Sequence, residues 1–395
     1  MEEWKEYKVA EVIDEISMGP FGSNIKRDNY VDFGVPYLNG SNLSSYKLNE
    51  ESFNYVTEEK AKSLGRCVAK RGDIIVTHRG TIGQISYIPY DSKYELYLTG
   101  NSQFRLTVNN KVIRPDFFVY YFHTRMGQHR LLANASQVGV PALARPTSTF
   151  KEVLVPVPKM EVQNKIMDIL HSIDDKIEVN RQINDNLEQQ AQALFKSWFV
   201  DFEPFKGGEF VESELGMIPK GWRVYILSEF LPVITGKKDA NVAQGGPYPF
   251  FSCSQDYGWT DEYSFDGNAI LVAGNGDFNV KMYNGKFEAY QRTYVLIPHN
   301  PQYTAWLYYA VKYHLNDITS AARGSVIKFI TKGNLADFRF PAPSNLVKAE
   351  IIEKFDCIRR MIASNEQESR RLATLRDTLL PKLMSGELKV NDIKE

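Results

Sequence analysis

The chain has 395 residues, 43% hydrophobic and 13% aromatic, so it is long enough for two or three domains and too apolar to be disordered. Three scattered cysteines exclude a disulfide framework and a zinc site and favour the cytoplasm. No run reaches the roughly 18 apolar residues of a membrane span, and the charged N-terminus is unlike a signal peptide.

The net charge of −1 gives no general attraction to nucleic acid, but the charges are unevenly distributed. Residues 103–151 contain seven Lys/Arg and one acidic residue, whereas residues 158–219 contain 6 Lys/Arg and 12 Asp/Glu. A nucleic-acid footprint is therefore expected on globular blocks of the chain and not on the acidic segment.

Residues 1–157 are predicted to form a first block with an irregular, mostly β core. An amphipathic turn is expected over 9–16, and short β-type runs separated by turn residues cover 35–38, 73–77, 84–88 and 104–108. Pro115 fits the first turn of a helix, and Pro156 and Pro158 impose an extended end on the block.

A long helix is predicted over Val162 to Trp198, inside a helical region 158–200, and a second one lies inside residues 343–395. In both, apolar residues recur at steps of three and four, which is the pattern of a helix that packs lengthwise on another helix. We expect the seam to consist of Ile166, Leu170, Ile173, Ile177, Asn180, Leu187, Leu194, Ile351, Phe355, Ile358, Ile362, Asn365, Leu372 and Leu379. Pro381 is expected to kink the second helix and Gly386 to cap it.

The two halves of the chain are an internal repeat. Residues 136–195 align with residues 321–380 without a gap, with 11 identities in 60 positions. Residues 201–219 are expected to be a linker, and residues 220–342 a second block that repeats the first. Duplication implies pseudo-twofold symmetry, which makes the two helices antiparallel with a centre near Asn180 and Asn365. These side chains either pair and fix the register or face solvent at the edge of the seam.

The length of the helix sets how far apart it can hold the two blocks. About 32 residues at 1.5 Å per residue span roughly 48 Å, which is enough to place two domains on DNA one helical turn apart or slightly more. Because the two blocks differ in sequence, the two half-sites should differ, with an unread spacer between them.

Catalytic motifs are mostly missing, since the sequence has no P-loop and no metal-binding His or Cys pattern. Two segments resemble motifs of methyltransferases. Asn300–Tyr303 resembles the Asn-Pro-Pro-Tyr type of loop but has Gln302 in place of the second proline, and Gly274–Asp277 resembles a glycine-rich cofactor loop but precedes a strand. Both are interpreted as turns.

Polar and basic residues near turns are the better candidates for function. Arg and Lys suit guanine edges and phosphates, whereas Asn and Gln suit adenine. The candidates for DNA binding are Lys26, Arg27, Asn39, Ser41, Asn42, His78, Arg79, Thr81, Asn101, Gln103, Arg105, Arg145, Lys237, Lys238, Ser252, Ser254, Gln255, Asn275, Asn279, Lys281, Gln291, Arg292, Arg323 and Lys328. The alternative for each of them is an ordinary solvated loop side chain.

The chain resembles the specificity (S) subunits of type I restriction–modification enzymes. The resemblance is carried by Gly221-Trp222-Arg223, by the segment Leu194–Pro204, by the two Pro-x-Pro junctions and by Leu379–Leu388. It implies an α+β fold with two target-recognition domains, separated by two long helices that form an antiparallel coiled coil.

The resemblance also implies a function without catalysis in this chain. Each recognition domain would read one half of an asymmetric bipartite site in double-stranded DNA, and the helices would dock two methyltransferase (M) subunits. S-adenosylmethionine would bind to the M subunits, which methylate adenine N6, and ATP and Mg to restriction (R) subunits. The alternatives are a self-contained adenine-N6 methyltransferase that uses Asn300–Tyr303 and a repeat scaffold that binds no DNA.

Overall fold

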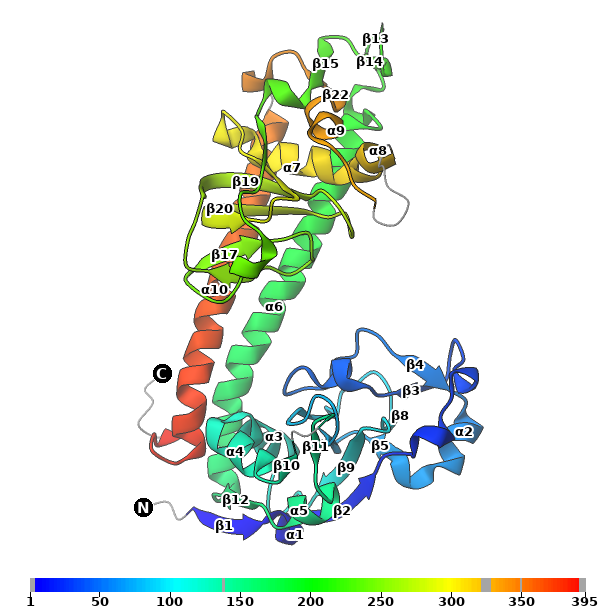
Figure 1. Cartoon of the computed structure of the whole chain (residues 1–395), viewed down its shortest axis with the longest axis vertical. Helices are drawn as coiled ribbons and strands as arrows, with labels where there is room; N and C mark the ends of the chain where they lie inside the picture. The colour runs from blue at the N-terminus through cyan, green and yellow to red at the C-terminus, as the bar shows by residue number, and fades with distance from the viewer. Residues whose placement is uncertain (1–3, 137–138, 321–327, 349, 391–395) are drawn as a thin grey trace. The chain divides into compact units, whose positions relative to one another are not determined.

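The computed structural model describes residues 4–136, 139–320, 328–348 and 350–390. The chain divides into two compact units, of which unit 1 contains residues 1–177 and 370–395 and unit 2 contains residues 178–369. Both units combine helices with sheets (Figure 1), in agreement with the predicted α+β class. The domain boundaries drawn from the sequence remain predictions.

Unit 1 contains two four-stranded sheets. The first has the order β2-β9-β6-β7, with every neighbour antiparallel, and the second has the order β4-β3-β8-β5. The strands are β1 (Lys5–Lys8), β2 (Ile13–Met18), β3 (Val35–Tyr37), β4 (Asn54–Val56), β5 (Val68–Lys70), β6 (Ile74–Thr77), β7 (Ile85–Tyr87), β8 (Leu96–Leu98), β9 (Gln103–Val108), β10 (Ala135–Ser136), β11 (Ala142–Leu143) and β12 (Leu154–Val157). The four runs predicted as strands are thus confirmed.

The short helices of unit 1 pack on the first sheet, except the one at residues 58–63, which packs on the second. They are α1 (Val9–Val12), α2 (Glu58–Ser63), α3 (Pro115–His123), α4 (Arg125–Leu132) and α5 (Pro146–Lys151), with 3-10 turns η1 (Gly22–Asn24), η2 (Arg27–Asn29), η3 (Gly40–Leu43) and η4 (Gly65–Cys67). Pro115 begins α3 as predicted, and the helix is buried over residues 115–122 because it is apolar on all sides. The amphipathic turn expected over 9–16 is shorter, since the chain enters β2 at Ile13.

Unit 2 is built around one six-stranded sheet of order β16-β21-β19-β20-β17-β18. Its strands are β13 (Phe210–Ser213), β14 (Gly216–Pro219), β15 (Trp222–Ile226), β16 (Val233–Thr235), β17 (Tyr248–Phe251), β18 (Gly258–Thr260), β19 (Phe265–Ala273), β20 (Val280–Ala289), β21 (Thr293–Leu296) and β22 (Arg339–Pro343). The strands β13 and β14 form a hairpin inside the segment expected to be a linker. The separate two-stranded sheet β15–β22 repeats the two-stranded sheet β1–β12 of unit 1.

The helices of unit 2 include a second apolar helix, which is buried from Thr304 to Val311 and corresponds to α3. They are α7 (Thr304–Tyr313), α8 (Leu315–Ser320) and α9 (Lys332–Ala336), with 3-10 turns η5 (Glu203–Phe205), η6 (Leu227–Glu229), η7 (Ala240–Val242), η8 (Pro301–Tyr303) and η9 (Leu346–Lys348). In each unit the sequence thus supplies one helix that is apolar on all sides, between a sheet and the long helices.

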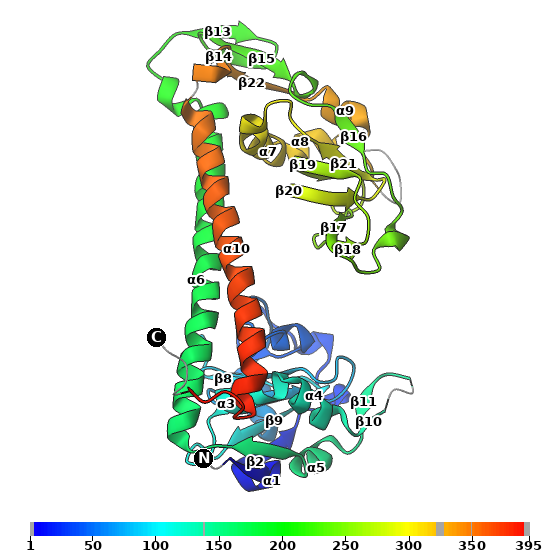
Figure 2. The same ribbon diagram turned by 90° about the vertical axis from the view of Figure 1, so that its left-hand side faces the viewer.

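Two long helices, α6 (Met160–Phe199) and α10 (Glu350–Met384), contribute one part to each unit. Within each unit the two helices run antiparallel and side by side (Figures 1 and 2). All the expected seam residues are buried or half-buried, and Ile166, Leu170, Phe355 and Ile362 are 4% exposed or less. The helix α10 continues past Pro381, and Gly386 follows it with φ +72, as expected of a helix cap.

The polar residues of the seam lie in unit 2 and do not pair in the expected way. The Asn180 amide nitrogen donates to the Asn365 carbonyl at 3.5 Å, to Glu368 Oε2 at 2.8 Å and to Ser369 Oγ at 3.3 Å. The Asn365 amide donates to Asn184 Oδ1 at 2.8 Å. Because Asn184 and Ser369 are themselves 185 residues apart, these two contacts are related by the internal repeat. Asn180 therefore bonds Ser369, and Asn365, its equivalent in the repeat, bonds Asn184, the equivalent of Ser369.

Candidate DNA interface

In unit 1 five loops meet at one end of the strands. We call residues 19–27, 39–45, 78–84, 100–103 and 141–145 loop cluster 1. The Gly40 carbonyl accepts a hydrogen bond from the Gln84 side chain at 3.1 Å, and Gly19 donates to the Gln103 carbonyl at 2.8 Å. Most of the candidates of the first block thus lie close together, although they are spread over more than 100 residues of sequence.

Unit 2 has a matching arrangement. We call residues 236–239, 252–257, 274–279, 290–292 and 328–331 loop cluster 2. Gln255 donates to Asp277 at 2.6 Å, Asn279 donates to the Cys253 carbonyl at 2.8 Å, and the Gln291 amide donates to the Lys238 carbonyl at 2.9 Å.

The same backbone hydrogen bonds support both loop clusters. In unit 1 they are Gly19 N to Gln103 O, His78 N to Ser102 O, Gly80 N to Pro141 O and Leu143 N to His78 O, at 2.8–2.9 Å. In unit 2 they are Gly236 N to Thr293 O, Gly274 N to Arg292 O, Gly276 N to Lys328 O and Ile330 N to Gly274 O, at 2.8–3.3 Å. These shared hydrogen bonds make Leu143 structurally equivalent to Ile330. The gapless alignment pairs Leu143 with Lys328 instead, so the predicted alignment is wrong by two residues at this position.

Several candidates have side chains that make no hydrogen bond or ion pair within the described part of the chain. These are Lys26, Arg27, Arg79, Arg145, Asn275, Gln291, Arg292 and Lys328. Six of them are cations, which gives both clusters the charge that a phosphate backbone requires. All eight remain candidates for DNA contact.

Other candidates already have partners within their unit. Asn39 accepts from Ser41, Thr81 donates to Gln84, Ser252 bonds Ser254, Ser102 donates to Asn101, Lys281 donates to the Ser254 carbonyl, Lys238 pairs with Glu262, and Lys237 lies over the Phe265 ring. Burial lowers the pKa of Lys281. His78 is half-buried, and burial lowers its pKa as well. These groups order the loops, and those that are exposed can still meet a ligand.

Four candidates are corrected because they are buried in internal networks. The Asn42 amide donates to the carbonyls of Asn49 and Ser52, and Arg105 pairs with Glu15 at 2.6 Å and bonds the Arg66 carbonyl. Gln103 accepts from Gly100 at 2.8 Å, and Asn279 ties two loops of cluster 2 together. Their burial removes them from the proposed contacts. Arg323 lies outside the described residues.

The candidates for DNA binding predicted from the sequence are all polar or basic, so they leave out exposed aromatic residues in or near the clusters. Phe21 is 82% exposed in the loop of cluster 1 that also contains Lys26, and Trp259 is 46% exposed next to Tyr257 at the edge of cluster 2. The available signal was an aromatic residue between turn glycines, Gly19-Pro20-Phe21-Gly22.

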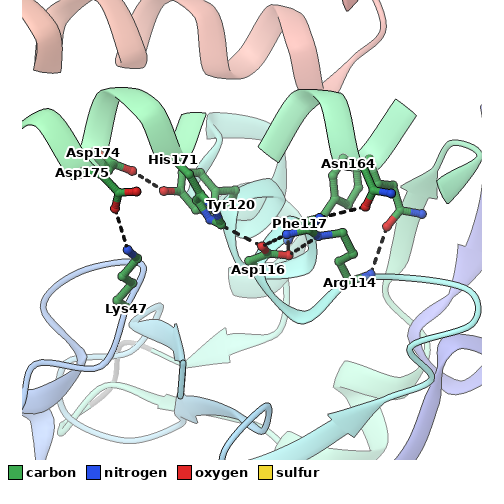
Figure 3. Close-up of polar contacts among 10 residues, drawn as sticks. Lys47, Arg114, Asp116, Phe117, Tyr120, Asn164, His171, Asp174 and Asp175 are labelled. Carbon is green, nitrogen blue, oxygen red and sulfur yellow. Dashed lines mark hydrogen bonds and ion pairs between the residues drawn. The ribbon is translucent and has the colours of Figure 1, made fainter. Parts of the chain in front are cut away.

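A polar network joins α3 and Lys47 to the long helices of unit 1 (Figure 3). The buried Tyr120 hydroxyl of α3 donates to Asp174 of α6 (Figure 3). Arg376 of α10 pairs with the same carboxylate at 2.7 Å. Lys47, which follows the loop 39–45, pairs with Asp175 at 3.1 Å.

The same close-up shows how α3 is held at its first turn (Figure 3). Arg114 binds Asp116 through two nitrogens, at 2.9 and 2.6 Å, and reaches Asn164 at 2.8 Å. His171 lies 3.4 Å from Asp116, and burial lowers the pKa of this histidine.

Unit 2 uses the same plan with different residues. The Tyr309 hydroxyl of α7 donates to Glu188 of α6 at 2.8 Å, Lys312 pairs with this carboxylate at 2.6 Å, and Arg359 of α10 lies 3.7 Å from it. Burial alone would raise the pKa of Glu188, but the hydrogen bond and charge of Lys312 outweigh it and lower that pKa.

The two segments that resemble methyltransferase motifs are structural turns. Asn300 caps η8 by accepting from the Gln302 amide at 3.1 Å, and the chain then enters α7. Gly274–Asp277 connects β19 to β20, which is a strand as predicted. Among the described residues no group of His, Cys, Asp or Glu is arranged to hold a metal ion, and no helix has the length and apolarity to cross a membrane.

The fold and the two loop clusters define a class of protein with two recognition units on a shared pair of helices. The chain belongs to the family described as the type I restriction modification DNA specificity domain, which matches residues 1–189 and 219–373.

Curated relatives carry the same assignment. The chain is 39% identical over 178 residues to the specificity subunit of the type I restriction enzyme EcoDI of Escherichia coli, a match that covers 44% of this chain and 40% of that subunit. It is 27% identical over 428 residues to the MjaIX specificity subunit of Methanocaldococcus jannaschii, covering 99% and 95% of the two chains. These relatives do not support the alternative of a self-contained methyltransferase.

A solved structure supports the fold alone. The S subunit of a type I restriction-modification system from M. genitalium superposes with a TM-score of 0.56 at 17% identity, over 96% of each chain.

Proposed function

We propose that this chain gives a type I restriction–modification complex its DNA sequence specificity and performs no catalysis itself. The observation that carries the proposal is the repeated loop frame, which presents a different set of unpaired polar side chains in each unit. Each unit reads one half of a bipartite target, and the target is asymmetric because the two clusters differ. Cations of the clusters seat the units on phosphates, and other side chains read base edges.

The partners follow from the same proposal. Two M subunits dock on the chain and bind S-adenosylmethionine, which supplies the methyl group, and R subunits bring ATP and Mg when they join. The long helices form the antiparallel coiled coil that sets the distance between the half-sites. The complex works on double-stranded DNA in the cytoplasm.

Sequencing of methylated adenines tests the proposal directly. Cells that carry the chain with its cognate M subunits are expected to show one bipartite, asymmetric methylated motif, which disappears when the chain is omitted. Methylation that persists without the chain would contradict the specificity role. Binding of S-adenosylmethionine by the purified chain alone would contradict the absence of a cofactor site.

Helix length provides a second test. Insertion of four residues, about one helical turn, after Asn180 and after Asn365 is expected to lengthen the unread spacer and to leave both half-sites unchanged. An unchanged spacer in a complex that still methylates DNA would show that the helices do not set the distance.

A further inference from the structure

Each loop cluster contains a three-residue tip at the same place in its frame. Tip 1 is Arg79–Thr81, between β6 and β7, and tip 2 is Asn275–Asp277, between β19 and β20. Arg79 forms an isolated β-bridge with Ala142, and Asn275 forms one with Phe329. Together with the shared hydrogen bonds, these bridges make Arg79 and Asn275 structurally equivalent.

The tips are held rigidly by backbone on both sides. Gly80 donates to Pro141 at 2.9 Å and Gly276 donates to Lys328 at 3.3 Å, while the residue before each tip accepts from Leu143 or Ile330. A side chain on such a tip is already positioned, so a contact made there loses little backbone entropy.

Both tips face open space. Gly80 has φ +84 and Gly276 has φ +71, and a Cβ atom added to either would meet nothing within 4 Å. Glycine is thus required here by the left-handed backbone and not by crowding. The open surface leaves room for a large ligand to approach the adjacent side chains.

Arg79 is exposed and Asn275 is partly exposed, and the two side chains are chemically different. Neither Arg79 nor Asn275 makes a side-chain hydrogen bond within the described residues, whereas Thr81 bonds Gln84 and Asp277 bonds Gln255. Each tip therefore presents one unpaired polar side chain next to one that orders the loop. A guanidinium matches the two acceptors of a guanine edge, and a carboxamide matches the donor and acceptor of an adenine edge.

We infer that Arg79 and Asn275 are the equivalent base-reading residues of the two units, with Arg79 binding a guanine in one half-site and Asn275 an adenine in the other. The inference rests on the proposed function and names two specificity-determining residues of it. Neighbouring cations, including Lys328 beside tip 2 and Arg145 in cluster 1, bind phosphates and contribute no base preference.

The test uses the complex of the chain with its M subunits in cells and reads the motif of methylated adenines. In Arg79→Ala, one guanine of one half-site is expected to become degenerate, with a loss of roughly 5- to 150-fold preference, while the other half-site stays unchanged. In Asn275→Ala, one adenine of the other half-site is expected to become degenerate. Arg79→Lys keeps the charge but loses the fork of donors, so it should relax the same guanine position even if Arg79→Ala abolishes methylation.

Matched controls separate base reading from a general loss of charge or fold. Lys111 is exposed beyond the opposite end of β9, and Asn316 is exposed on α8, so Lys111→Ala and Asn316→Ala should leave the motif unchanged.

The outcomes distinguish the tips from the wider function. If the wild-type chain directs a bipartite motif that the Arg79 and Asn275 variants leave intact, the tip inference is overturned and the specificity role stands. A wild-type motif without guanine in either half-site would overturn it as well. If the wild-type complex methylates no defined motif, the proposed function fails and takes the inference with it.

Discussion

Unit 1 and unit 2 both attach their apolar helix to the long helices through a tyrosine, a carboxylate of α6 and an arginine of α10, but they distribute charge differently. In unit 1 Asp174 accepts a hydrogen bond from Tyr120 and forms an ion pair with Arg376. Arg376 has a second ion-pair partner in Asp377, at 2.9 Å. Glu188 in unit 2 is the common partner of Tyr309, Lys312 and Arg359. The plan is repeated and its residues are not, which indicates that the geometry of attachment matters more than the identity of any one pair.

The largest effect is expected from removing the shared carboxylate of unit 2. Glu188→Ala leaves Lys312, Arg359 and the Tyr309 hydroxyl without their common partner. We expect a loss of about 3 kcal/mol of stability, at the lower end of the range for breaking a buried ion pair, because Glu188 and Lys312 are half-buried. Asp174→Ala should cost about 2 kcal/mol, because Arg376 keeps Asp377. Hydrogen exchange of amides in α7 and α3 measures the two losses separately.

Asp168→Ala provides the control, because Asp168 is an exposed acid on the same helix, with an expected change within about 0.5 kcal/mol. Equal losses in Glu188→Ala and Asp174→Ala would show that the second partner of Arg376 has no compensating role.

The stabilities of the two units should respond differently to acid. In unit 1, burial lowers the pKa values of His78, His123 and His171, so the unfolded chain takes up protons near pH 6.5 while the folded unit does not. The stability of unit 1 is therefore expected to fall as the pH drops below about 6.5. The lowered pKa of Glu188 acts in a lower range, since its contribution is lost only as the pH falls below about 4.5.

Hydrogen exchange at pH 7 and pH 5 checks this difference. Protection of α3 should decrease between these values, after correction for intrinsic exchange rates, while protection of α7 is retained. In His123→Asn and His171→Asn the decrease in α3 should become smaller. Parallel losses in both units would mean that the buried histidines do not determine the acid response.

These networks also show where inference from sequence succeeds and where it stops. The long helices follow from apolar spacing, and the strand at Ile74–Thr77 follows from a β-branched run, because both signals are local. The buried role of Arg105 depends on Glu15, far away in sequence, which no local pattern reveals. Asn42 and Gln103 instead bond backbone groups within their own loops. A polar residue beside a turn has the same signature whether it meets DNA or a carbonyl of its own loop.

The internal repeat was the strongest long-range signal in the sequence, yet it could not align the loops. The gapless match extends back to residues 136 and 321, whereas the hydrogen-bond frame requires a shift of two residues before Pro156 and Pro341. Identities in the helices and at the proline junctions are constrained by packing, and the loop sequences are free to differ once their backbone bonds are kept. The equivalence of Arg79 and Asn275 is therefore visible only in the structure.

The smallest effect concerns the polar positions of the seam, where the two members of one repeat pair are not equally buried. Asn180 is 1% exposed and makes three contacts across the helix pair, whereas Asn365 is half-buried and its side chain reaches Asn184. We expect Asn180→Ala to destabilise unit 2 by about 1–2 kcal/mol and Asn365→Ala by about half as much, since fewer polar groups lose a partner in the second variant. Chemical denaturation, monitored through hydrogen exchange of the amides of residues 178–190, measures both losses of stability. Gln189→Ala, an exposed substitution about two and a half turns further along α6, should leave the stability of unit 2 unchanged. A larger loss for Asn365→Ala would mean that the half-buried Asn365–Asn184 bond, and not Asn180, fixes the register of the helices.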